Sequence, residues 1–206
     1  MTMVNTRAQR TTELPQPNEI LKICRNAADG DQDARRRLMD LLFNRIHRTA
    51  SYLSSNLDDA RDIAQTACVE VLLSAGSYRG EAAITFWADR VTLQTAAKVF
   101  TKKTRRQRLR ERYLQPTRPM MAIDDHFENS AVRERLTRLL QSMKRKHREA
   151  VVFRYIHDYT NQEVADLFNI PLETARDRLK KGRATLKKKV MADPLLAEWI
   201  KEWGEL

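Results

Sequence analysis

Apolar residues recur at steps of three and four along most of the chain, which is the period of an amphipathic α-helix. Between residues 33 and 53 they form one stripe, made of Leu38, Leu41, Leu42, Ile46, Ala50 and Leu53. A second helix is predicted to begin at Asp58 and Asp59, and a third near Ala83, with a break at residues 76–80 between them. Because no alternation of period two is sustained, we predict an all-α fold.

Prolines and changes in composition divide the predicted helices into two small domains. The segment 114–130 holds two prolines and several acidic residues but no helical period, so it is predicted to be a flexible linker. The other parts are a flexible arm (1–18), an N-terminal domain (19–113), a C-terminal domain (131–190) and a helical tail (191–206). The tail carries an apolar stripe, which either packs on the C-terminal domain or binds a partner.

The C-terminal domain carries the pattern of a helix-turn-helix. Thr160 and Glu163 have the spacing of a capping box, which opens a short helix. Asn169 tolerates a left-handed backbone and Pro171 suits a helix start, so a tight turn is predicted between two helices. The second helix is apolar on one side, where Gly182 allows either close packing or a bend, and cationic on the other. Such a helix fits the major groove of DNA, although a plain two-helix unit with a basic surface has the same pattern.

The distribution of charge indicates what kind of partner the chain has, and the composition excludes several classes of protein. The 206 residues carry a formal net charge of +11, from 38 Lys and Arg against 27 Asp and Glu. Seven of the cations lie in 101–112 and eight in 171–190, which indicates a polyanionic partner at two places. Two cysteines and four scattered histidines do not suggest a disulfide framework or a metal site. Since neither a membrane-spanning run nor a secretory signal is evident, we expect a cytoplasmic protein without membrane insertion.

Two sets of motifs resemble those of one family. In residues 146–187, the runs Glu163-Val-Ala, Ile170-Pro171 and Thr174-Ala-Arg-Asp-Arg178-Leu179 resemble the "E-I-A", "I-P" and "T-V-K-S-R-L" of the promoter-reading domain of bacterial sigma factors. In the N-terminal domain, the runs Asp59-Ala-Arg-Asp62-Ile-Ala-Gln65, Tyr78-Arg-Gly-Glu81 and Thr85 to Val91 resemble the polymerase-binding and −10-reading motifs. With only these two domains evident, the chain is similar to the extracytoplasmic-function (ECF) sigma factors.

The resemblance implies a role for each motif. Core RNA polymerase would be bound by Asp59, Asp62 and Gln65. The −10 element of promoter DNA would be bound by Tyr78, Arg79, Gly80, Glu81, Arg90, Lys98, Lys102 and Lys103. The −35 element would be bound by Thr174, Arg176, Arg178, Lys180 and Lys181. An anti-sigma factor is implied as a further partner, and neither a cofactor nor catalytic activity is expected, because trapping unpaired bases melts DNA by differential binding.

Two other functions are weighed against this one. A dimeric helix-turn-helix repressor or activator would explain the C-terminal domain, but it leaves the motifs at 59–65 and 78–91 without a role. A helical nuclease is disfavoured, because the histidines are not paired with carboxylates at metal-binding spacing. Phe86 and Trp87 could stack on bases, but their position beside Val91 is more consistent with the core.

Overall fold

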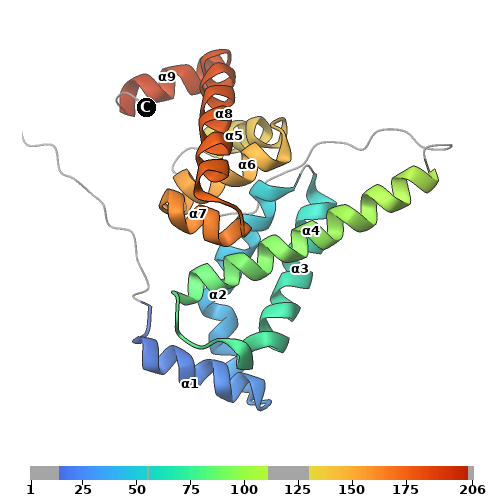
Figure 1. The fold of residues 1–206 in the computed structure, drawn as a ribbon, viewed down its shortest axis with the longest axis vertical. Helices are drawn as coiled ribbons and strands as arrows, with labels where there is room; N and C mark the ends of the chain where they lie inside the picture. Colours follow the sequence, from blue (N-terminus) through green and yellow to red (C-terminus); the bar gives the residue numbers. More distant parts are fainter. Residues whose placement is uncertain (1–13, 55, 111–129, 204–206) are drawn as a thin grey trace, which may run out of the picture.

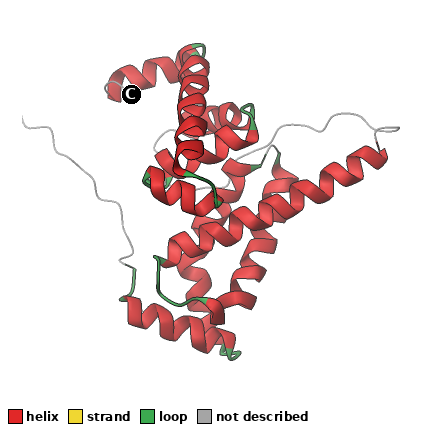
Figure 2. Ribbon diagram, viewed as in Figure 1, coloured by secondary structure: helices red, strands yellow, loops and turns green. Residues whose placement is uncertain are grey.

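The computed structural model describes residues 14–54, 56–110 and 130–203, and the elements of these segments are helices (Figures 1 and 2). The N-terminal half comprises α1 (Pro17–Ala28), α2 (Gln32–Leu53), α3 (Leu57–Ser74), the short 3-10 turn η1 (Ala75–Ser77) and α4 (Ile84–Arg110). The C-terminal half comprises α5 (Ser130–Gln141), α6 (Arg145–Val151), the π-helical turn η2 (Val152–Ile156), α7 (Asn161–Phe168), α8 (Leu172–Met191) and α9 (Pro194–Trp203). The predicted all-α fold is confirmed, and the described residues contain no strand.

Local capping explains where several helices begin. The capping box is present at α7, where the Thr160 side chain accepts from the Glu163 backbone N–H and the Glu163 carboxylate accepts from the Thr160 N–H. The α3 helix is capped by Asn56 rather than by the aspartates that follow it. At the N-terminus, α1 begins at Pro17, two residues inside the predicted arm, since proline at a first helical position has a suitable φ and no N–H to satisfy.

The N-terminal half is built around α2. Its buried stripe, which includes Leu38, Leu42 and Ile46, packs against α1, α3 and α4. Burial of such side chains contributes about 1.5–3 kcal/mol each, so this stripe is a main source of stability. The last turns of α2 also contact α5, α6 and η2, so the two halves pack directly on one another (Figure 1).

In the C-terminal half, α7 and α8 form the expected helix-turn-helix. Asn169 has left-handed backbone angles (φ 51°), and its backbone N–H closes the end of α7. Gly182 is where α8 lies against α6, because a Cβ atom there would stand 2.7 Å from Val151 Cγ2 and 3.0 Å from the His147 carbonyl oxygen. Of the two uses predicted for this glycine, the structure therefore shows close packing.

The tail packs on the C-terminal half. Asp193 caps α9 by accepting from the backbone N–H groups of Leu195 and Leu196, and it forms an ion pair with Arg135 of α5. Leu196 is buried against α5 and α8. The predicted linker lies almost wholly outside the described residues, as do residues 1–13 of the predicted arm.

Candidate functional site

One side of α8 packs against the rest of the C-terminal half, and its exposed side carries cationic side chains. Ala175 and Leu179 are buried against the rest of the domain, whereas four of the predicted −35 residues are exposed: Thr174, Arg176, Lys180 and Lys181. The fifth, Arg178, is half-buried, and its guanidinium carbon lies 6.0 Å from the centre of the Phe168 ring. The structure thus gathers all five residues on one helix, with Arg178 held by an aromatic ring.

Two of these cations have partners on their own helix. Arg176 pairs with Glu173, and Lys181 Nζ lies 2.7 Å from an oxygen of Asp177. The hydrogen bond from Lys181 lowers the pKa of the Asp177 carboxyl, so Asp177 stays ionised on this face. Because both pairs are exposed, each contributes little stability, and a phosphate can displace them at small cost.

The motif in α3 divides between the surface and the interior. Asp62 and Gln65 are exposed. Asp59 is 8% exposed, and its carboxylate accepts a 2.7 Å hydrogen bond from the Asn56 amide. On the exposed face, Val69 (51% exposed) and Leu73 (79% exposed) follow Gln65 at steps of four residues. The exposed face of α3 is therefore polar near the start of the helix and apolar near its end.

Sequence reasoning missed the apolar end of this surface. Val69 and Leu73 lie among apolar residues, and in a helix with many apolar positions the sequence does not say which of them face outward. The available signal is the run of steps of three and four that leads from Asp62 through Gln65 to Val69 and Leu73, because these steps place all four residues on one face of the helix. We call this set, Asp62, Gln65, Val69 and Leu73, the α3 surface.

The loop between η1 and α4 is held in place by Tyr78. Its hydroxyl donates a 2.8 Å hydrogen bond to the Ala82 carbonyl oxygen, and its ring centre lies 5.6 Å from that of Trp87. Tyr78 is 8% exposed, so it shapes the loop and does not offer a free ring for a base. The neighbouring residues predicted to bind the −10 element, Arg79, Gly80 and Glu81, are exposed.

The following helix carries the remaining −10 residues. Arg90, Lys98 and Lys102 are exposed on α4, and Lys98 Nζ lies 3.2 Å from a carboxylate oxygen of Glu70. The backbone of Lys103 belongs to α4, but its side chain is outside the described part of the structure. Phe86 and Trp87 are half-buried and pack against the core, as the sequence suggested.

Comparisons with known proteins agree with this arrangement. The family model described as sigma-70, region 4, matches residues 133–186, which include α6, α7 and most of α8. The ECF RNA polymerase sigma factor SigW of Bacillus subtilis is 22% identical over 180 residues, which cover 83% of this chain and 96% of SigW. The ECF RNA polymerase sigma-E factor of Escherichia coli K12 is 25% identical over 181 residues, covering 78% and 88% of the two chains. The chain is an ECF-type sigma factor.

Solved structures share the fold of this sigma factor. The sigma factor RpoE of Bartonella quintana, in a complex with the anti-sigma factor NepR, superposes with a TM-score of 0.64 at 16% identity and covers 77% of this chain and 97% of its own. CnrH, in a complex with the cytosolic domain of CnrY, has a TM-score of 0.58 at 16% identity and covers 84% and 97%. At these identities the likeness establishes the fold.

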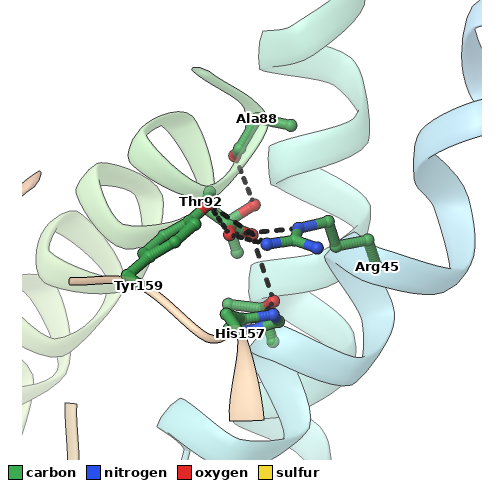
Figure 3. Close-up of polar contacts among 7 residues, drawn as sticks. Arg45, Ala88, Thr92, His157 and Tyr159 are labelled. Atoms are coloured by element: carbon green, nitrogen blue, oxygen red, sulfur yellow. Dashed lines mark hydrogen bonds and ion pairs between the residues drawn. The ribbon is translucent and has the colours of Figure 1, made fainter. Parts of the chain in front are cut away.

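A buried polar cluster lies where the two halves of this sigma factor meet (Figure 3). Asp89 of α4 is 0% exposed, and one of its carboxylate oxygens accepts from Arg45 Nη2 and from the Tyr159 hydroxyl, both at 2.7 Å. The Thr49 hydroxyl donates to the other oxygen at 3.3 Å and lies 2.9 Å from His157 Nε2. Burial raises the pKa of Tyr159, so its hydroxyl stays protonated and donates. This cluster could not be predicted from the sequence, because its members come from three segments, around residues 45–49, 89 and 157–159, that lie 40 or more residues apart.

His157 makes the stability of this sigma factor depend on pH. Burial lowers its pKa to about 4, and the nearby charges of Asp89, Asp158, Arg45 and Arg48 partly cancel. In the unfolded chain the group titrates near 6.5, so below that pH the unfolded state binds more protons and stability falls. We expect the free energy of unfolding to drop by about 2 kcal/mol between pH 7 and pH 5 from this group. Urea denaturation at a series of pH values measures it.

The control for this prediction is a variant that lacks the titrating imidazole of His157. His157→Asn keeps a polar side chain near Thr49 but does not gain a proton in this range, so its stability is expected to change less between pH 7 and pH 5. Equal pH dependence in the two proteins would assign the effect to other groups.

The described residues contain no group of three or more His, Cys, Asp or Glu side chains that could hold a metal ion. Among the same residues, no helix combines the length and apolar character that crossing a membrane requires.

Proposed function

We propose that this sigma factor binds core RNA polymerase, recognises the −10 and −35 elements of promoters and starts transcription there. The observation that carries the proposal is the separation of three surfaces on one chain: the α3 surface, the basic side of α4 and the basic side of α8. A dimeric helix-turn-helix repressor or activator would leave the motifs at 59–65 and 78–91 without a role. Sigma factors as a family are generally not enzymes, and we propose that this chain likewise acts by binding alone.

The α3 surface is our proposed contact with the polymerase. Asp62 and Gln65 are exposed near the start of α3 and can pair with arginines of a partner. Val69 and Leu73 would bury apolar area in the same contact, which explains why a stable chain exposes them. Asp59 contributes mainly by fixing the start of α3 through Asn56.

The two DNA contacts use different chemistry. At the −10 element, the exposed loop residues Arg79, Gly80 and Glu81 would meet an unpaired base, while Arg90, Lys98, Lys102 and Lys103 would follow the phosphates. Tyr78 and Gly80 hold the loop against the rest of the domain. We place this role in residues 19–113 and −35 recognition in residues 131–190.

At the −35 element, we propose that Arg178 reads a base and that Thr174, Arg176, Lys180 and Lys181 hold the backbone. Contact with the Phe168 ring restricts the Arg178 side chain, and a restricted guanidinium is better suited to a bidentate contact. Arg178→Ala is expected to reduce discrimination between −35 sequences by about 1–3 kcal/mol. Binding assays of the holoenzyme on promoters with single substitutions in the −35 element measure this.

Two controls define that result. Lys180→Ala is expected to weaken binding about equally on all promoters, since a phosphate contact carries no sequence information. Arg138→Ala, an exposed arginine of α5 paired with Glu134, is expected to change neither quantity. If Arg178→Ala weakened every promoter equally, Arg178 would be a phosphate contact instead.

RNA polymerase and the chromosome lie in the cytoplasm of bacteria, so we propose that this chain acts there. The structural relatives were solved with an anti-sigma factor and with the cytosolic domain of CnrY, and we propose that an anti-sigma factor also regulates this chain. The deciding experiment is in-vitro transcription with core polymerase and a promoter library. Promoter-specific transcripts that require this chain support the proposal, and their absence together with a lack of polymerase binding would overturn it.

A further inference from the structure

An acidic side chain lies at the centre of the basic side of α8. Asp177 is two residues from both Ala175 and Leu179, which are buried, so at 3.6 residues per turn it lies roughly opposite them around the helix axis. Its side chain is 54% exposed. Thr174 and Lys181 flank it at steps of three and four residues and are also exposed. Asp177 is therefore on the part of α8 that faces most directly away from the core.

The stability of the helix does not account for this carboxylate. An acidic side chain gains from the helix dipole in the first turn, but Asp177 lies beyond that turn, which already holds Glu173. The ion pair between Asp177 and Lys181 is exposed, so it adds little stability. The residue is better explained by what α8 binds than by how α8 folds.

A carboxylate at this place opposes binding to DNA in general. Duplex DNA carries one negative charge for about every 1.7 Å of its axis, so an anion in the major groove is repelled by the phosphates on both sides. The hydrogen bond from Lys181 is the main cause that keeps the pKa of the Asp177 carboxyl below its usual range. The carboxyl group is therefore ionised and can only accept hydrogen bonds. An anion of this kind is tolerated in the groove where a base offers it a donor.

Among the base edges in the major groove, cytosine suits such an acceptor best. The N4 amino group of cytosine is a donor, whereas guanine presents two acceptors, N7 and O6, and thymine presents the O4 acceptor and a methyl group. Adenine is intermediate, because its N6 donor lies beside its N7 acceptor. A carboxylate would thus attract one base and repel others, and this combination yields specificity more than affinity.

We propose that Asp177 determines specificity at the −35 element by accepting a hydrogen bond from the N4 amino group of a cytosine at one position and disfavouring guanine and thymine there. The inference rests on the proposed function, in which α8 reads the −35 element. Lys181 holds the carboxylate in the free protein and turns to a phosphate when DNA binds. In the motif "T-V-K-S-R-L" that this segment resembles, a serine stands at this position, so the preference belongs to this chain.

The test measures base preference in the holoenzyme, which is core polymerase with the full-length chain. Binding is recorded on a promoter that the parent holoenzyme transcribes, with each −35 position changed in turn to each of the four bases. The variants are Asp177→Ala, Asp177→Asn and Lys181→Ala. Glu173→Ala is the control matched in charge, because it removes an exposed carboxylate one turn earlier on the same helix. Thermal melts show whether each variant is folded.

In the parent we expect one −35 position at which cytosine is bound about tenfold more tightly than guanine or thymine. Asp177→Ala should abolish this preference and raise the affinity for unrelated DNA, because one repulsive charge is gone. Asp177→Asn should shift the preference to adenine, since an amide accepts from N6 and donates to N7. Lys181→Ala should weaken binding about equally on all promoters and keep the preference for cytosine.

The variants separate a base contact from two simpler roles. If Lys181→Ala abolished the same preference, Asp177 would act only by orienting Lys181, and the inference would be overturned. If Glu173→Ala changed the base preference as Asp177→Ala does, net charge would be responsible, which also contradicts the inference.

The same measurements distinguish a failure of this inference from a failure of the proposed function. Unchanged base preferences in Asp177→Ala and Asp177→Asn, in a holoenzyme that selects −35 sequences and directs transcription, would overturn the role of Asp177 and leave the proposed function standing. A parent chain that gives no polymerase-dependent binding to any promoter would overturn both.

Discussion

Gly182→Val is expected to destabilise the C-terminal half by about 2–3 kcal/mol. A Cβ atom at this position would already stand 2.7 Å from Val151 Cγ2 and 3.0 Å from the His147 carbonyl oxygen, and valine adds two methyl groups. The backbone of α6 would have to move away from α8, and overpacking of this kind typically costs about 1–3 kcal/mol. The small gain in helix propensity over glycine, about 0.5 kcal/mol, does not offset it.

Chemical denaturation of the full-length protein measures this effect, with Ala184→Val as the matched control. Ala184 is exposed two residues further along α8, so the same new side chain should cost only about 0.5 kcal/mol there. A rescue test locates the clash: Gly182→Ala should be less harmful when Val151→Ala removes the nearest methyl group. Equal losses at positions 182 and 184 would show that helix propensity, and not close packing, decides the matter.

Asp62→Arg is expected to reduce affinity for core RNA polymerase about a hundredfold or more. The substitution reverses the charge on the exposed α3 surface, and bringing like charges together across an interface costs several kcal/mol. The fold should be unaffected, since no hydrogen bond or ion pair of Asp62 contributes to the core packing described above. Affinity is measured by titrating labelled protein with core polymerase.

Asp40→Arg is the control for this substitution. It makes the same change in net charge at an exposed position of α2 that is not part of the α3 surface, and should leave the affinity nearly unchanged. If Asp62→Arg bound as well as Asp40→Arg, the α3 surface would not be the polymerase contact. Equal weakening by both would point to long-range repulsion, which added salt would reduce.

Some local features could be predicted because neighbouring residues produce them. The capping box at Thr160 and Glu163, the turn at Asn169 and the apolar side of α8 all depend on spacings of four residues or fewer. The exposed cations of α8 follow from the same periodicity, because burying one side of a helix turns the other to solvent. These features put the −35 residues implied by the resemblance on one predicted helix.

Other features could not be predicted, because a side chain's surroundings depend on distant segments. Tyr78 belongs to the motif that the resemblance assigns to the −10 element, yet it is turned inward by its bond to Ala82 and its contact with Trp87. Val69 and Leu73 have apolar side chains of the kind found in protein cores, but they lie on the surface. Hydrophobicity favours burial without guaranteeing it, and the packing of neighbouring helices decides which positions are covered.

The sequence by itself determined the all-α fold class, the capping box of α7, the helix-turn-helix and the two concentrations of positive charge, since each depends on periodicity or on residues close along the chain. Only the tertiary structure decided that Asp89 is buried between Arg45 and Tyr159, which lie 44 and 70 residues away, and that α8 meets α6 at Gly182. The physical reason is that a buried carboxylate is stable only where donors converge on it. Here they converge from α2 and from the segment before α7, and only folding brings those two segments together.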